Sequence, residues 1–117
     1  MRAEIITLLQ ASVSFPVTWG TLGDDDGLPR AALFRVSGIR DMHLEGTGLM
    51  QSRVQIDCYG RTASQAGGAA DDIREALEGY QGGTIQGAFL EAVRDTNDRD
   101  AELLQRVSLT FSITHRD

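Results

Sequence analysis

A regular alternation of apolar and polar residues over residues 53–59, within the run Leu49–Gly60, limits the folds open to this chain more than any other feature. Such a period of two places one set of side chains on each face of a β-strand. We therefore expect Cys58, a member of the apolar set, to be buried, reduced and inert as a nucleophile, with a raised thiol pKa. The apolar set is Val54, Ile56 and Cys58, and the polar set is Arg53, Gln55, Asp57 and Tyr59.

An Ala- and Gly-rich segment follows this strand, and its apolar residues recur at three- and four-residue spacing. This spacing predicts a helix over residues 64–80, which ends before Gly82 and Gly83. Inside the helix, Gly67 and Gly68 each cost roughly 1 kcal/mol relative to alanine, and we expect close packing of the helix on the sheet to compensate. The apolar stripe consists of Ala66, Ala70, Ile73, Leu77 and Tyr80.

The other periodic segments complete an α+β pattern. Helical spacing predicts a short helix over Arg2–Ser12, ended before Pro16, and brief β character predicts an edge strand over Val17–Trp19. Further strands are predicted over residues 32–39, 85–94 and 107–114. The order predicts a mostly antiparallel sheet of four to five strands with two helices packed on one face.

Two of these strands carry more specific expectations. The strand over residues 85–94 has no wholly polar face, so we expect it to be covered on both sides, and residues 95–100 to form the turn that follows. The last strand should face the helix that carries Ile73 and Leu77 and so form the main core. Its inward residues are Val107, Leu109, Phe111 and Ile113.

Length and charge limit the classes of protein to consider. A chain of 117 residues fits one domain spanning residues 1–117. No apolar stretch reaches the roughly 20 residues that span a bilayer, and the N-terminus does not resemble a secretory signal, so we expect intracellular synthesis. The net charge of −6 and the absence of lysine argue against nucleic-acid binding as the main activity.

The candidate chemical groups all have a simpler structural interpretation. One cysteine and two histidines cannot build a Cys/His zinc cluster. The acidic runs at residues 24–26 and 95–100 are typical of solvated turns, and His43 and His115 are expected on the surface. We therefore predict no catalytic, metal or cofactor site, and no cofactor.

The strands carry unusually polar outer faces, for which two interpretations stay open. They are either solvated sheet faces, common in antiparallel sheets, or contact surfaces for neighbouring subunits. One face is lined by Arg53, Gln55 and Asp57, and another by Arg106, Ser108, Thr110, Ser112 and Thr114.

Several segments in order resemble the tail terminator, or tail completion, proteins of long-tailed phages. The sequence FRVSG at residues 34–38 resembles a strand of that family, and residues 40–46 resemble the charged loop that follows it. The sequence RVQIDCY at residues 53–59 looks like the family's central strand. The helix ending IREAL at residues 73–77 and the final strand QRVSLTF at residues 105–111 are similar too, so the resemblance covers nearly the whole chain. Residues 15–27 are shorter than in some members.

The resemblance implies a virion structural protein that forms a ring, expected to be a hexamer as in the family, on the end of the tail tube. Its implied partners are further copies of itself, the tail tube protein and the head–tail connector or neck protein, with DNA passing through the ring without specific binding. We expect the loop at residues 41–48 to become ordered on assembly. The candidate subunit contacts are Asp41, Met42, His43, Leu44, Glu45, Arg53, Gln55, Asp57 and Arg106.

Two other classes stay open from the sequence. The chain could be another head–tail or neck adaptor, or a small intracellular ligand-binding or enzymatic α+β domain. A deep pocket with shifted titratable groups would favour the last of these.

Overall fold

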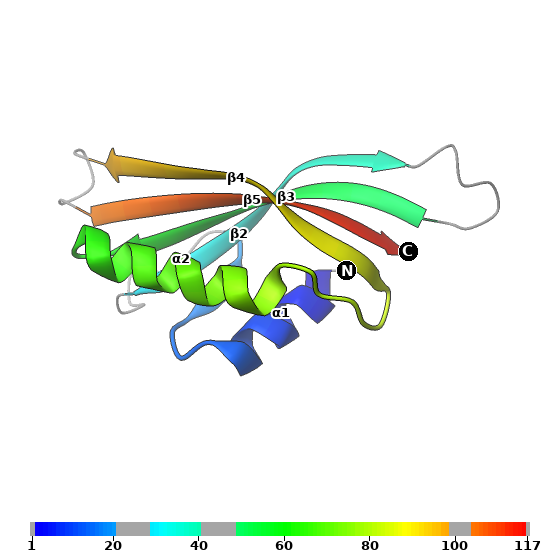
Figure 1. The fold of residues 1–117 in the computed structure, drawn as a ribbon, viewed down its shortest axis with the longest axis horizontal. Helices are drawn as coiled ribbons and strands as arrows, with labels where there is room; N and C mark the ends of the chain where they lie inside the picture. Colours follow the sequence, from blue (N-terminus) through cyan, green and yellow to red (C-terminus); the bar gives the residue numbers. More distant parts are fainter. Residues whose placement is uncertain (1, 21–28, 41–48, 99–103, 117) are drawn as a thin grey trace.

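The computed structural model describes residues 2–20, 29–40, 49–98 and 104–116. The elements follow the order that the sequence predicts (Figure 1). They are α1 (Arg2–Ser12), β1 (Val17–Trp19), β2 (Arg30–Arg40), β3 (Leu49–Gly60), α2 (Ala63–Leu77), β4 (Ile85–Asp98) and β5 (Leu104–Arg116).

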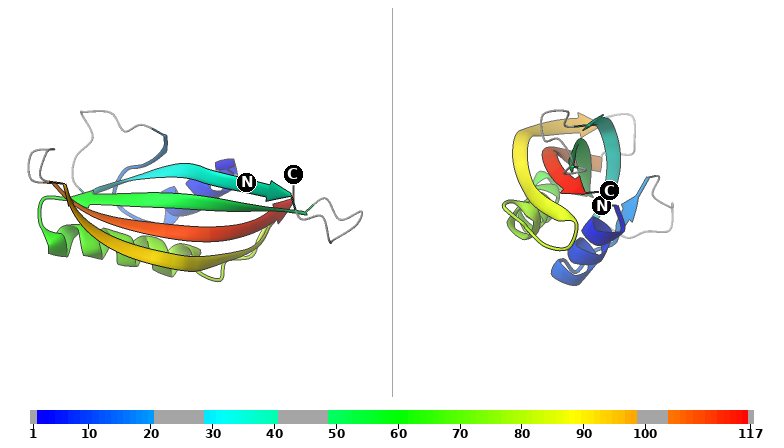
Figure 2. Two further views of the ribbon diagram at one scale, coloured as in Figure 1. Left: turned by 90° about the horizontal axis from the view of Figure 1, so that it is seen from above. Right: turned by 90° about the vertical axis from the view of Figure 1, so that its right-hand side faces the viewer.

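The five strands form one sheet in the order β1-β2-β3-β5-β4. The short β1 runs parallel to β2, and every other neighbouring pair is antiparallel. Both helices lie on the same side of the sheet, where α2 contacts β3 and β5 and α1 contacts α2 and β1 (Figure 2). The predicted α+β class, with a mostly antiparallel sheet and helices on one face, is confirmed.

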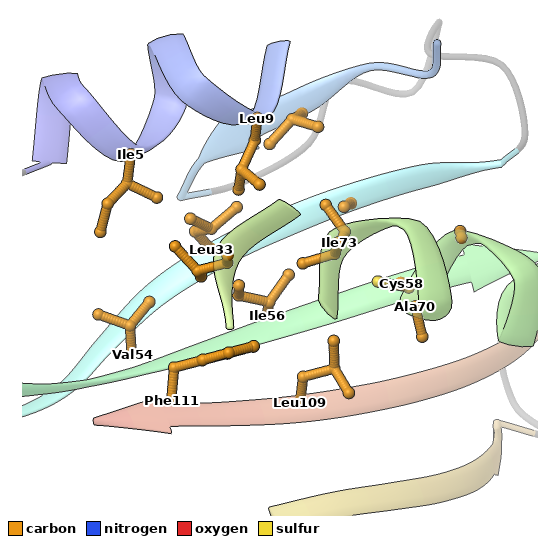
Figure 3. Packing of buried hydrophobic residues seen from close by; sticks show 14 of the residues in the cluster. Ile5, Leu9, Leu33, Val54, Ile56, Cys58, Ala70, Ile73, Leu109 and Phe111 are labelled. Carbon is orange, nitrogen blue, oxygen red and sulfur yellow. The ribbon is translucent and has the colours of Figure 1, made fainter. Parts of the chain in front are cut away.

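The core lies between α2 and the two central strands, because the strand register brings their apolar residues opposite one another. Val54 pairs with Phe111, and Ile56 pairs with Leu109. These side chains point towards the helices, where Ile73 projects from α2 into the same cluster (Figure 3). The last strand therefore faces α2 as predicted.

The first turn of α2 is fixed by its own polar side chains. The Thr62 hydroxyl accepts a hydrogen bond from the Gln65 backbone N–H at 3.0 Å, and the Gln65 side chain accepts one from the Arg61 N–H at 2.7 Å. This reciprocal capping satisfies two donors that the helix itself leaves unpaired.

The glycines of α2 do not have the role that the sequence suggests. A Cβ added at Gly67 or Gly68 would meet nothing within 4 Å, so close packing on the sheet does not explain them. The close approach is at Gly60 instead, where a Cβ would lie 2.6 Å from the backbone nitrogen of Ala66. The tight contact therefore lies at the turn between β3 and α2.

The helix α1 is tied to the turn before β4 by one carboxylate. The Glu4 carboxylate accepts hydrogen bonds from the Thr84 backbone N–H, at 3.0 Å, and from the Thr84 hydroxyl. These hydrogen bonds lower the pKa of Glu4. The contact joins residues 80 positions apart in the sequence.

The structure corrects two predictions for β4. The strand continues to Asp98, and residues 95–98 pair with residues 104–107 of β5 rather than forming a turn. Its second half is also not covered on both sides, because residues 91–95 are all exposed. The reason is its place at the edge of the sheet, since α2 packs mainly on β3 and β5.

Candidate assembly surface

The sheet face turned away from the helices is lined by polar side chains from the two central strands. Register places Arg53 opposite Ser112, and Gln55 opposite Thr110. The Gln51 amide donates a hydrogen bond to the Ser112 hydroxyl at 2.8 Å. This face is therefore a continuous hydrogen-bonding surface, as the polar alternation in the sequence predicts.

Asp57 lies on this face but is almost fully buried, with 5% of its surface exposed. Its Oδ1 accepts hydrogen bonds from the Ser108 hydroxyl at 2.7 Å and from the Gln55 side-chain amide at 2.9 Å. Two donors within the sheet compensate the desolvation of this carboxylate. Asp57, one of the candidate contact residues, therefore holds the side chains of Gln55 and Ser108 in place within the subunit.

Arg53 forms an ion pair with Glu91 of β4, spanning β5, which lies between their strands. Its Nε donates to Oε1 at 2.8 Å, and its second guanidinium nitrogen donates to Oε2 at 3.3 Å. This contact with Glu91 raises the pKa of Arg53, and the two side chains remain 49% and 36% exposed. Glu91 was missed in the sequence because the partners are 38 residues apart.

Arg106 borders a hollow of about 260 Å³ on the same face, opposite Tyr59 in the register. Its buried Nε has no hydrogen-bond partner, and Arg94 brings a second guanidinium group to the hollow. The volume is below the roughly 300–1,000 Å³ of typical small-molecule sites. The full lining is Gln55, Ala92, Arg94, Arg106, Ser108 and Thr110.

The other candidate contact residues lie outside the residues that the structure describes. These are Asp41, Met42, His43, Leu44 and Glu45, and the acidic run at residues 24–26 lies outside them as well. Their predicted part in assembly stays a prediction. The strands that flank residues 41–48 are neighbours, since Arg40 pairs with Met50.

Sequence reasoning missed the exposed apolar side chains on β2 and β4, the strands that flank the central pair of the sheet. Phe34 and Val36 of β2 are 37% and 55% exposed, and Phe89 and Val93 of β4 are 59% and 52% exposed. The absence of a polar face in β4 was the available signal. Burial on both sides, which this absence predicts, is wrong, because the apolar residues are exposed on an edge strand.

His115 is completely buried, so its predicted surface position is wrong. It continues the inward set of β5 two residues after Ile113, and its Nε2 lies 2.8 Å from the Ser52 hydroxyl. A serine beside a histidine is the contact that nucleophilic catalysis needs. Ser52 is also completely buried, however, so a substrate could not reach the pair, and its role is to satisfy polar groups in the core.

Cys58 is completely buried in the apolar cluster, as predicted. Burial, and to a smaller extent the charge of Asp57, raise its thiol pKa to about 12. Because the thiolate is the reactive form, the side chain acts as a small apolar core residue.

Within the described ranges, His, Cys, Asp and Glu side chains form no group of three or more that could hold a metal ion. The helices of the same ranges include none long and apolar enough to cross a membrane.

Taken together, the described residues present a polar sheet face and exposed apolar side chains on strands, and no accessible catalytic cluster. Exposed sheet edges and polar sheet faces are the features that proteins use for contacts with other macromolecules. Residues 3–116 match the family described as tail completion protein gp17. The chain belongs to this family, and it is a structural protein of the virion tail.

A solved structure has the same fold. A chain from the virion of a native gene transfer agent (GTA) particle matches with a TM-score of 0.66 at 16% sequence identity. The match covers 98% of the present chain and 86% of the other. No curated protein sequence matches the chain.

Proposed function

We propose that this protein caps the tail tube as a ring, most simply a hexamer, which ends tail polymerisation and forms the joint to the head connector. The observation that carries the proposal is the family match over residues 3–116. The likeness in fold to a chain of a phage-like virion supports it. The partners are further copies of the chain, the tail tube protein and a head–tail connector or neck protein.

Symmetry supplies the mechanism of capping. A tube that grows by head-to-tail addition of identical rings is an open-ended polymer, because each new ring exposes the same face again. A ring that matches the tube on one face and differs on the other stops this addition. The differing face is then free to bind a second partner at the head side.

The charge of the chain suits a ring through which DNA passes. Six copies at −6 each carry −36. Proteins that hold DNA by its phosphates need a surplus of basic side chains, and here the balance is the opposite. DNA would therefore move past the ring without binding tightly to it.

The test of capping is tail length in particles made without this protein. Deleting its gene should give tails of broad, extended length that do not join heads, as measured by electron microscopy. Expression of the intact chain from a plasmid should restore a single length, whereas an empty plasmid should not.

Two results would overturn the proposal. An unchanged length distribution with normal particles would show that the chain does not end polymerisation. Tails of normal length that fail to join heads would assign it to a neck adaptor instead. End-on electron micrographs of the tail terminus show whether a ring is present and give its rotational symmetry. A symmetry other than sixfold would exclude the hexamer.

A further inference from the structure

The four exposed large apolar side chains of the described residues all lie on the two strands that flank the central pair of the sheet. Phe34 and Val36 belong to β2, and Phe89 and Val93 belong to β4. The strand β4 is the last of the sheet, and β2 is covered by β1 only over residues 31–33 (Figure 2). Open edges with exposed apolar residues are surfaces on which another strand can dock.

The sequences of the two strands also differ in the sign of their formal charge. The strand β2 contains three arginines and no acidic residue, a formal charge of +3. The strand β4 has a formal charge of −2, from one arginine, Asp95, Asp98 and Glu91, of which Glu91 is paired with Arg53. Each edge would repel a copy of itself and attract the other edge, which favours a head-to-tail contact over a symmetric dimer.

We propose that the β2 edge of one copy docks on the β4 edge of the next copy, so that the sheet continues from subunit to subunit. The proposal rests on the ring of the proposed function and names its subunit interface. The strands β2, β3, β5 and β4 alternate in direction. A following β2 therefore runs antiparallel to β4, which is the arrangement already present within the subunit.

The register places the exposed residues of the two edges at matching heights. Height here means position along the strand direction. Successive pairs across β3 and β5 connect Ser37 of β2 with Phe89 of β4. Val36, the neighbour of Ser37, therefore lies at nearly the same height as Phe89. In the same way, successive pairs across β3 and β5 connect Phe34 of β2 with Ala92 of β4, next to the exposed Val93. A rotation about an axis along the strands keeps these heights, so it brings Val36 of one copy close to Phe89 of its neighbour.

Both edges also carry an irregularity that weakens this contact. The register shifts between Arg35 and Ser37 in β2, and between Leu90 and Ala92 in β4. Bulges at sheet edges hinder pairing with other strands. The contact is therefore weak for free subunits and becomes stable when the tail tube holds several copies side by side.

The test is cross-linking of assembled tails that carry V36C together with F89C. Both wild-type side chains are exposed, so the substitutions leave the core intact, and Cys58 is buried and stays unreactive. A short bifunctional maleimide should convert this variant into a ladder of covalent oligomers on a denaturing gel. A mixture of the two single variants should stop at dimers.

A matched control moves one thiol to the helix side. S64C with F89C places the first thiol at an exposed position of α2 and should give monomers only. A ladder from this control, or dimers from F89C alone, would overturn the edge-to-edge contact. Melting of each variant near the wild-type temperature shows that it is folded.

The interface and the function fail in different ways. Capped tails of normal length with a visible ring, but without cross-links from V36C with F89C, would overturn the interface and leave the function in place. Tail length that does not depend on the gene would overturn the function. A ladder formed by the concentrated pure variant would still support the interface in that case.

Discussion

Phe111 is completely buried at the centre of the core, opposite Val54 and among side chains of α2. Replacing it with alanine removes most of an aromatic side chain and leaves a cavity that the sheet cannot close. We expect Phe111→Ala to lower the free energy of unfolding by about 3–5 kcal/mol. Urea denaturation followed by circular dichroism measures the change.

Phe89 offers a matched control on the neighbouring strand. It is 59% exposed, so Phe89→Ala should change the free energy of unfolding of the free subunit by less than about 0.5 kcal/mol. Equal losses for the two variants would contradict the assignment of faces on β4 and β5.

Cys58 gives the stability of this protein a specific dependence on alkaline pH. Its thiol pKa rises from the ordinary value of 9.0 to about 12 in the folded chain, chiefly through burial. Below pH 9.0 the thiol is protonated in both the folded and the unfolded chain, so burying Cys58 contributes its full stabilisation. As the pH rises from there towards about 12, only the unfolded chain releases the proton, so stability is lost.

We expect Cys58→Ala to reduce this alkaline loss by up to about 1.4 kcal/mol per pH unit relative to the wild type. Denaturant titrations of both proteins between about pH 8 and pH 10.5 measure the difference. Native protein should also react slowly with a thiol reagent and unfolded protein quickly. Parallel pH curves for the two proteins, or rapid labelling of the native state, would place Cys58 in water.

The helix α2 contains two glycines that its surroundings do not require. Added Cβ atoms at Gly67 and Gly68 would meet no other atom within 4 Å. Alanine restricts the unfolded chain and favours the helical backbone, so each Gly→Ala change should stabilise the protein by about 0.5–1 kcal/mol. The rise in melting temperature measures the gain.

At Gly60, in the turn before α2, we expect a change to alanine to destabilise the protein, in contrast to the two helical glycines. A Cβ there would lie 2.6 Å from the Ala66 nitrogen, which is backbone and cannot swing aside. Gly60→Ala should therefore destabilise the protein. A gain at Gly60, or losses at both helical glycines, would show that the helix sits differently on the sheet.

The acidic charge of the whole chain opposes its association. Six copies carry −36, and bringing them together concentrates this repulsion. We expect the purified protein to be weakly associated at low salt and to form larger species as salt screens the charge. Added tail tubes should promote assembly at lower protein concentration, since each subunit then gains a second contact.

Light scattering across protein and salt concentration, with and without tubes, measures this behaviour. Bovine serum albumin, a protein of unrelated surface, serves as the control for non-specific adsorption to tubes. A tight dimer under every condition would contradict the expected ring.

The sequence by itself determined the elements and their faces, because both depend on local periodicity. The alternation around Ile56 and the helical stripe through Ile73 can each be seen within one segment, and burying these faces leaves few arrangements. The buried position of Cys58 follows from the same alternation. The α+β class, the order of elements and the inward face of β5 were predictable for this reason.

Only the tertiary structure decided which residues meet across the sheet and where its edges lie. The partners Ser52 and His115, and Arg53 and Glu91, are 63 and 38 residues apart, and local patterns carry no information on such distances. The same limit explains β4, whose apolar residues fit a covered strand as well as an exposed edge. Strand order resolves this ambiguity, since it places β4 at the edge of the sheet, while α2 packs mainly on β3 and β5.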